Sequence, residues 1–337
     1  KFETEREMMF PYIVRRVFVM ILMLTILSII TFLLFNAVPT DPAMLTCGKT
    51  CTPEIVAANR IRLGLDQPLY VQYVDWIKGI FLGRTYGSGS ATFECSTPCL
   101  GYSFRNGEEV TTMIVDALPV TLYLASGAFV LWMFIGISAG IVAAKNHGKW
   151  QDRAVMSVSL IGYSLPVFFV GLLLLIFVIV RWNFLPYPNY ESPFEDPLAF
   201  FQTMLLPWVT LAILYAAYYA RLTRSQLLET MGEDYIRTAR AKGLSERVVF
   251  RKHAFRAGLT PIVTSAGLDL AGLLGGAVIT EYIFSLPGLG RLAIGAVTEY
   301  DLPTITATVL VAAVFVIVAN LVVDILYAAI DPRVRLT

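Results

Sequence analysis

Four cysteines are the residues of this 337-residue chain whose type and spacing most directly allow chemistry. Cys47 and Cys51 form one C-x-x-x-C pair, and Cys95 and Cys99 form a second. Thiols at this spacing can close disulfides, and two to four intervening residues are also usual between zinc-ligating cysteines. Four cysteines allow three disulfide connectivities, and the sequence does not choose between local pairs and longer cross-links.

Residue sets that carry out catalysis are missing from the sequence. The chain has no G-x-x-x-x-G-K-[ST] phosphate-binding loop, no H-E-x-x-H motif and no G-x-S-x-G motif. Its two histidines, His147 and His253, stand far apart in basic stretches, where a histidine is usually solvated or makes a contact. We therefore expect no catalytic residue, no cofactor held by this chain and, with a net charge of +1, no nucleic-acid partner.

Asp269 is the main ionisable residue deep within an apolar stretch. A carboxylate in a bilayer costs at least about 2.5 kcal/mol on insertion scales, so such groups usually face a bundle interior or a wet path. Asp269 is expected either to line a substrate path, where it would favour a cationic group, or to hydrogen-bond a neighbouring helix. Asp116 and Asp324 lie near the ends of apolar stretches and are expected to be structural.

The elements that must position these residues are membrane spans. Hydrophobic residues make up 56% of the chain and charged residues only 15%, outside the range of soluble domains. A bilayer core of about 30 Å needs about 20 apolar residues per helix. Six apolar runs meet that need, at residues 12–38, 111–144, 155–182, 199–222, 259–284 and 304–330. We predict an all-α membrane protein with six transmembrane helices.

Charge decides the orientation of the predicted spans. Most of the 26 lysines and arginines fall in the segments that one of the two orientations places in the cytoplasm, so both termini are expected there. Residues 1–11 form the N-terminal tail, 12–38 the first span, 39–110 an extracytoplasmic segment, 111–330 a five-helix core and 331–337 the C-terminal tail. Arg15-Arg16 resembles the start of an export signal, but the long apolar run without a small-residue cleavage site predicts an uncleaved anchor.

This orientation bears on the cysteines, because all four lie in the extracytoplasmic segment 39–110. Disulfides persist in oxidising compartments outside the cytoplasm. We therefore expect two disulfides there rather than a metal site.

Glycine and proline positions predict how the spans pack. The pairs Gly136/Gly140 and Gly272/Gly276 are spaced G-x-x-x-G, which permits close helix approach within the subunit or against a partner. Pro166 and Pro207 are expected to interrupt the third and fourth spans.

A basic, polar stretch at residues 231–261 separates the fourth and fifth spans, where a short loop would be enough. Its centre, TARAKGL at residues 238–244, predicts a short helix ended by Gly243 in the left-handed conformation. Such a helix, held outside the bilayer, can dock into a groove of another protein. The alternative is a basic face at anionic lipid headgroups, where each charge contributes about 1 kcal/mol.

Motifs along nearly the whole chain resemble the dipeptide/oligopeptide/nickel family of ABC importer permeases, which have the type I importer fold. They are YIVRR at 12–16, VPTDPA at 38–43, LGLDQP at 63–68, ARLTR at 220–224 leading into GEDYIRTARAKGL at 232–244, FSLPGLG at 284–290 and DILYAAIDPR at 324–333. The chain departs from the general importer motif, whose Glu-Ala-Ala is replaced by Arg237-Thr238-Ala239 and whose Ile-x-Leu-Pro is replaced around His253 and Phe255. Both departures are typical of the peptide branch.

The resemblance implies a permease subunit of an ATP-driven importer in the plasma (inner) membrane of a prokaryote. It would form a path for di- or oligopeptides with a homologous second permease, receive substrate from an extracytoplasmic binding protein, and contact two P-loop ATPase subunits that hold ATP and Mg²⁺. The basic stretch would be the cytoplasmic coupling helix within residues 225–257, its small residues allowing close approach. The implied coupling residues are Glu233, Asp234, Tyr235, Arg237, Thr238, Ala239, Arg240, Ala241, Lys242, Gly243 and Leu244.

Two other classes make different sequence predictions. A self-contained secondary transporter or channel should have charged relays within its spans and inverted repeats between its halves. An intramembrane enzyme should have a nucleophile and a base within the spans. The sequence has one deep acid and no convincing repeat, so the importer permease is the favoured hypothesis.

Overall fold

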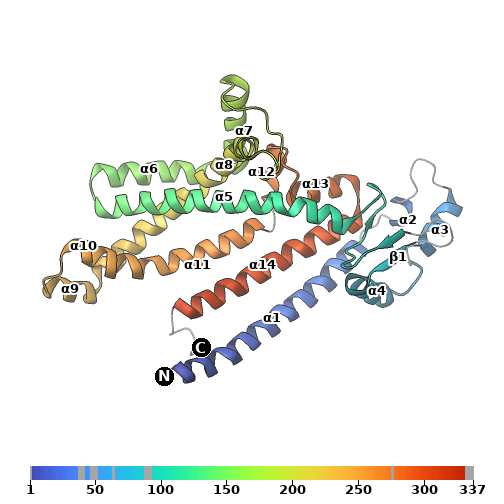
Figure 1. Cartoon of the computed structure of the whole chain (residues 1–337), viewed down its shortest axis with the longest axis horizontal. Helices are drawn as coiled ribbons and strands as arrows, with labels where there is room; N and C mark the ends of the chain where they lie inside the picture. The colour runs from blue at the N-terminus through green and yellow to red at the C-terminus, as the bar shows by residue number, and fades with distance from the viewer. Residues whose placement is uncertain are drawn as a thin grey trace.

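The computed structural model describes residues 2–36, 42–45, 52–62, 65–86, 93–274 and 277–330. Long helices run side by side along the longest axis of the molecule (Figure 1). They are α1 (Phe2–Asn36), α5 (Val110–Lys145), α6 (Trp150–Ser164), α8 (Pro197–Gly232), α11 (Phe255–Leu274) and α14 (Leu302–Ile330).

Shorter elements connect the long helices. They are α7 (Val167–Leu174) with the π-helix η1 (Leu175–Arg181), α9 (Asp234–Ala241), α10 (Glu246–Val248) with the π-helix η2 (Val249–Ala254), α12 (Val278–Ile283) and α13 (Leu289–Glu299).

The segment between α1 and α5 is not purely helical. It contains α2 (Pro42–Leu45), α3 (Pro53–Arg62), α4 (Leu69–Leu82) and two short antiparallel pairs, β1 (Arg84–Tyr86) with β2 (Phe93–Cys95) and β3 (Tyr102–Ser103) with β4 (Glu108–Glu109). In the first pair Arg84 lies opposite Cys95, and in the second Tyr102 lies opposite Glu109. The fold is therefore mostly helical, and the prediction of an all-α protein is wrong for this small region.

Among the described residues, four helices are long and apolar enough to cross a membrane, and a bent pair makes a fifth candidate. The four are Val14–Leu33 within α1, Val110–Lys145, Pro197–Gly232 and Leu302–Val322 within α14. The pair Trp150–Ser164 and Val167–Arg181 is bent by 97° at the break that contains Pro166. Pro207, by contrast, lies inside the continuous helix α8.

The fifth predicted span, residues 259–284, is not one helix. Helix α11 ends at Leu274, and α12 is a separate short helix. The six predicted spans are therefore represented by four single candidates, one bent pair and a 20-residue helix that falls outside the candidate set.

The core is formed where α5 and α8 approach closely. A Cβ added to Gly136 would lie 2.7 Å from Tyr219 Cβ, and one added to Gly140 would lie 2.5 Å from Thr223 Cβ. These two glycines therefore allow the contact that their spacing predicts. Gly272 is exposed with nothing within 4 Å of an added Cβ, and its predicted companion Gly276 lies outside the described residues.

The two polar regions lie at opposite ends of the long axis (Figure 1). Helices α9 and α10 and the turn between α5 and α6 are at the left end, and helices α2, α3 and α4 with strand β1 are at the right end. Helix α1 begins, and α14 ends, toward the left. This is the separation that the predicted orientation requires between the basic stretch and the segment after the first span.

Candidate functional site

Helix α9 forms directly after α8, across the single residue Glu233. Asp234 lies in its first turn and Arg240 in its last, so both charges oppose the helix dipole favourably. The Thr238 hydroxyl donates to the Asp234 carbonyl at 3.0 Å. The predicted helix centred on residues 238–244 therefore begins earlier than expected and ends at Ala241.

One face of α9 is buried within its own chain. Ile236 is fully buried, and Ala239 is 6% exposed. Both pack against Val249 and Ala254 of η2, with the half-buried Met231 beside them. Ala239, expected to allow close approach of a partner, instead packs against η2 of its own chain.

The turn after α9 depends on a glycine. Gly243 has φ +78°, and its N–H donates to the Arg240 carbonyl at 2.9 Å. An added Cβ would meet nothing within 4 Å, so glycine is required here by backbone conformation rather than by space. The predicted left-handed end of the helix is confirmed, and Lys242, Gly243 and Leu244 form the turn.

The other residues of this stretch form an exposed rim, which we call the α9 rim. It consists of Glu233, Asp234, Tyr235, Arg237, Thr238, Arg240, Ala241, Lys242, Gly243 and Leu244. Arg240 donates from Nε and Nη2 to the two carboxylate oxygens of Glu246, at 2.8 and 3.3 Å. Arg237 and Asp234 are 3.4 Å apart with side chains 74% and 95% exposed, a pair that contributes little in water. Partial burial raises the pKa of Tyr235, and the charge of Glu233 acts in the same direction.

Two contacts connect the α5–α6 turn to the elements around α9. Asp152 of α6 is buried and accepts a hydrogen bond from Arg224 Nη2 of α8 at 2.8 Å. The Gly148 N–H donates to the same carboxylate at 3.0 Å, and His147 Nδ1 lies 3.2 Å from it. Lys145 Nζ lies 4.5 Å from the ring centroid of Phe250 in η2.

Sequence reasoning placed His147 among solvated or contact residues, and the structure makes it a contact. Sequence reasoning missed the ion pair of the buried Asp152 with the partly exposed Arg224. The available signal was that Asp152 is the only acid in the otherwise basic stretch 145–153.

Asp269 lies at the contact of α11 with α8. Its Oδ2 accepts a hydrogen bond from the Tyr219 hydroxyl at 2.6 Å. Tyr219 is fully buried and stacks on Trp132 of α5, with ring centroids 6.5 Å apart. Asp269 itself is half-buried. The predicted alternative of a hydrogen bond to a neighbouring helix is therefore present, and the carboxylate keeps partial exposure.

The structure describes one of the two cysteine pairs. Cys95 and Cys99 form a disulfide and are buried with Tyr86, while Tyr102 and Phe104 pack beside them. This confirms a local disulfide for the second pair and excludes zinc binding by these two thiols. Cys47 and Cys51 lie outside the described residues.

Glu281 of α12 is a buried carboxylate that the sequence analysis did not single out. It is fully buried, and its Oε1 accepts from the Thr121 hydroxyl of α5 at 2.8 Å. Its Oε2 accepts from the backbone N–H groups of Gly290 and Arg291, at 2.7 and 3.1 Å. Glu281 therefore caps the N-terminus of α13 and joins it to α5. The available signal was an acid within an apolar run, followed by the glycines at 288 and 290.

Comparison with known proteins gives consistent matches. Residues 136–336 match the family described as binding-protein-dependent transport system inner membrane component, and residues 9–125 match the model of its N-terminal region. A putative peptide transport system permease protein of Brucella melitensis biotype 1 is 40% identical over 328 residues, covering 97% of this chain and 99% of that protein. The glutathione transport system permease protein GsiC of Escherichia coli O6:H1 is 37% identical and covers 97% of this chain and 99% of that protein.

A solved structure is similar in fold alone. An inward-facing form of the MetNI methionine ABC transporter matches with a TM-score of 0.52 and 20% identity, over 66% of this chain and 97% of that one.

Proposed function

Because this chain belongs to the family of binding-protein-dependent transport system inner membrane components, we propose that it forms, with a homologous second permease, the membrane path of an ATP-driven importer for di- or oligopeptides. The relatives named as peptide and glutathione transport permeases support the substrate class. In this role the chain itself carries out no chemical step, and ATP and Mg²⁺ are held by partner ATPase subunits.

The proposed topology has six crossings in a prokaryotic inner membrane, with both termini in the cytoplasm. The candidate spans supply up to five crossings, and α11 would supply the sixth. The separation of the α9 rim from the disulfide-bonded segment along the long axis supports this arrangement (Figure 1).

The α9 rim is the proposed contact with an ATPase subunit, and its geometry is the observation that carries this part of the proposal. The buried Ile236 packs α9 against η2, while every residue from Arg240 to Val248 is exposed. A rigidly seated helix with an uncovered polar rim is suited to fit into a groove of another protein. ATP-driven closure of the ATPases would then move α9 together with α8 and, through Arg224 and Asp152, α6.

Asp269 is proposed to border the substrate path. Its half-exposed position at the α8–α11 contact supports this, and Tyr219 fixes one of its oxygens. A carboxylate held in this way favours a cationic group.

The first test is purification of this chain from its native membrane in mild detergent, with mass spectrometry of the proteins that remain bound. We expect a P-loop ATPase and a second permease in stoichiometric amounts, and an ATPase activity that the substrate-loaded binding protein increases. Peptide transport by the isolated chain, driven by an ion gradient without an ATPase, would contradict the importer and favour a secondary transporter.

A further inference from the structure

Helix α4, in the segment between α1 and α5, carries an apolar face that we call the α4 stripe. It consists of Tyr70, Val74, Ile77 and Phe81, which share one side of the helix because they recur at helical spacing. Tyr70 is 72% exposed, Val74 43% and Phe81 71%, and Ile77 is partly exposed. None of the four belongs to a hydrophobic core cluster of the described part of the chain. A contiguous exposed apolar face of this kind marks an interaction surface.

Both charged residues of α4, Asp75 and Lys78, lie outside the α4 stripe and are exposed. At 100° per residue, Asp75 lies about 130° from the middle of the stripe. Lys78 borders the stripe, where a lysine stem can lie along an apolar surface while its ammonium reaches water. On the remaining side, Gln72 Nε2 donates to the Gln67 carbonyl at 2.8 Å. An apolar face beside a charged one is the pattern of helices that lie flat in a membrane interface.

Helix α4 is held against the candidate span in α1, beside which it lies in Figure 1. The hydroxyl oxygens of Tyr73 and Ser28 are 2.8 Å apart. The Phe32 ring centroid lies 5.4 Å from that of Tyr73 and 5.9 Å from that of Trp76. Ser28 lies about 7.5 Å before the end of the candidate span Val14–Leu33, at 1.5 Å per residue. Interfacial helices bury their apolar face about 5–10 Å into the boundary between headgroups and acyl chains, so the contact with Ser28 sets α4 at that depth.

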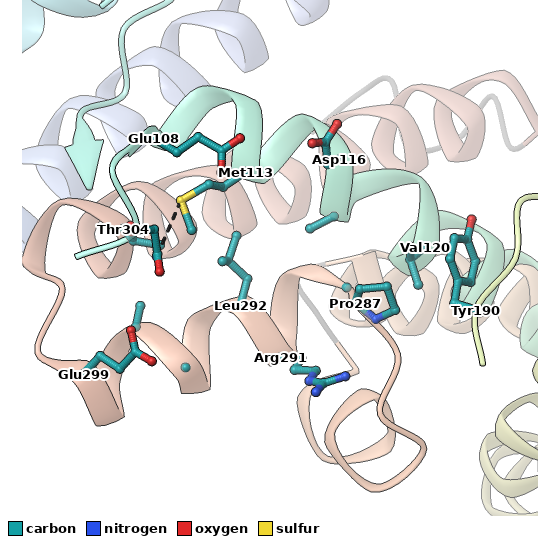
Figure 2. A pocket seen from close by; sticks show the side chains of 15 residues that line it. Glu108, Met113, Asp116, Val120, Tyr190, Pro287, Arg291, Leu292, Glu299 and Thr304 are labelled. Carbon is teal, nitrogen blue, oxygen red and sulfur yellow. Dashed lines mark hydrogen bonds between the residues drawn. The ribbon is translucent and has the colours of Figure 1, made fainter. Parts of the chain in front are cut away.

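Another open surface at this end of the molecule has the opposite character. A cavity of about 590 Å³ between α5 and α13 is lined by exposed charged side chains, as Figure 2 shows. They are Glu108, Asp116, Arg291 and Glu299. Charged groups of this kind are suited to water, whereas the α4 stripe contains none. The apolar face of α4 is therefore not a general property of the surface at this end.

We propose that α4 lies in the outer interface of the membrane, with the α4 stripe among the lipid acyl chains and Asp75 and Lys78 directed to water. The contact with lipid follows from the position of α4 beside α1, and only the choice of the outer side rests on the proposed orientation. The segment between α1 and α5 is then attached to the membrane at its middle as well as at its two ends. This attachment gives the segment a fixed position at the membrane surface.

The test measures the surroundings of single nitroxide labels on α4. The variants Y70C, V74C and F81C are labelled in the complex purified through this chain and reconstituted in vesicles of phosphatidylethanolamine and phosphatidylglycerol, without binding protein. Power saturation gives the accessibility of each label to oxygen, which partitions into lipid, and to a neutral nickel complex, which stays in water. The ratio of oxygen to nickel accessibility should be at least about threefold higher at these positions than on the charged side of the helix, as expected for burial in the interface.

The matched controls are D75C and K78C, which place the same label on the charged side of the same helix. The protein without an introduced cysteine gives the background from the native cysteines. Equal ratios at all five positions, with high nickel accessibility, would show that the α4 stripe faces water and would overturn the proposal. Low accessibility of Y70C, V74C and F81C to both reagents would also overturn it, because a partner protein would then cover the stripe. Neither result depends on peptide transport, so the proposed function is tested separately.

Discussion

At the scale of single residues, two kinds of constraint operate in this chain, one local and one distant in sequence. Gly243 needs a positive φ because the helix ends there, and that could be predicted from the order of small residues followed by glycine. Glu281 depends on Thr121, 160 positions away, and on amides at the start of another helix. The local signal at Glu281, an acid within an apolar run, marks the residue as unusual but does not identify Thr121 as its partner.

The local constraint gives a prediction about coupling. Replacing Gly243 with valine forces a β-branched residue into a left-handed conformation, which costs about 1–2 kcal/mol and distorts the α9 rim. We expect G243V to lower substrate-stimulated ATPase activity and uptake at least fivefold, with membrane insertion intact.

The control for this variant is G107V. Gly107 also has a positive φ, +70°, and open space around an added Cβ, but it lies in the β3–β4 turn. Coupled transport by G243V equal to that of G107V would refute the docking role of the rim.

The distant constraint gives a prediction about stability. In E281Q the amide oxygen can still accept from Gly290 and Arg291, but the NH₂ group faces the Thr121 hydroxyl and leaves it without its acceptor. A lost buried hydrogen bond of this kind costs about 1–3 kcal/mol. Thermal unfolding of the purified complex should show a lower Tm for E281Q and an unchanged Tm for E195Q, an exposed acid. Equal Tm values for the two variants would mean that the cap of α13 is not important for stability.

At the scale of elements, helices with long apolar patterns were predictable and irregular connections were not. Residues 110–145 form a single helix close to the predicted span 111–144, because its apolar run is long. Residues 197–232 also form a single helix, which continues ten residues past the predicted span 199–222. Pro166 lies at the predicted break, whereas Pro207 lies inside the continuous helix α8. The separate helices α12 and α13 and the two short strand pairs are held by buried contacts between distant segments, which periodicity does not encode.

The junction between α6 and α8 can be tested as an element contact. Asp152 is buried and Arg224 is partly exposed, so removing one partner leaves the other without its ion pair and is expected to cost about 1–3 kcal/mol locally. We expect D152N and R224Q to weaken coupling of ATP hydrolysis to uptake, and the double variant to lose less than the sum of the two. The measurement is a double-mutant cycle of substrate-stimulated ATPase activity, and strict additivity would show that the contact does not connect the helices functionally.

At the scale of the whole molecule, the ends of the long axis should face different compartments. We expect a cysteine introduced as N106C to react with a membrane-impermeant maleimide in intact cells, and K242C to react only after the membrane is opened. Both positions are exposed, so accessibility within the chain is matched. The reverse labelling pattern would invert the proposed orientation and exclude the α9 rim from the cytoplasm.

Helix α8 has a further consequence, which is mechanical. It is continuous for 36 residues and carries α9 at its end, so it is a rod about 54 Å long with a short head. If α8 tilted by about 10° about the end that carries α9, its other end would move by about 9 Å. A small rotation of the ATPase groove is therefore amplified by leverage, and the permease needs no hinge within α8 to convert it into a wide opening.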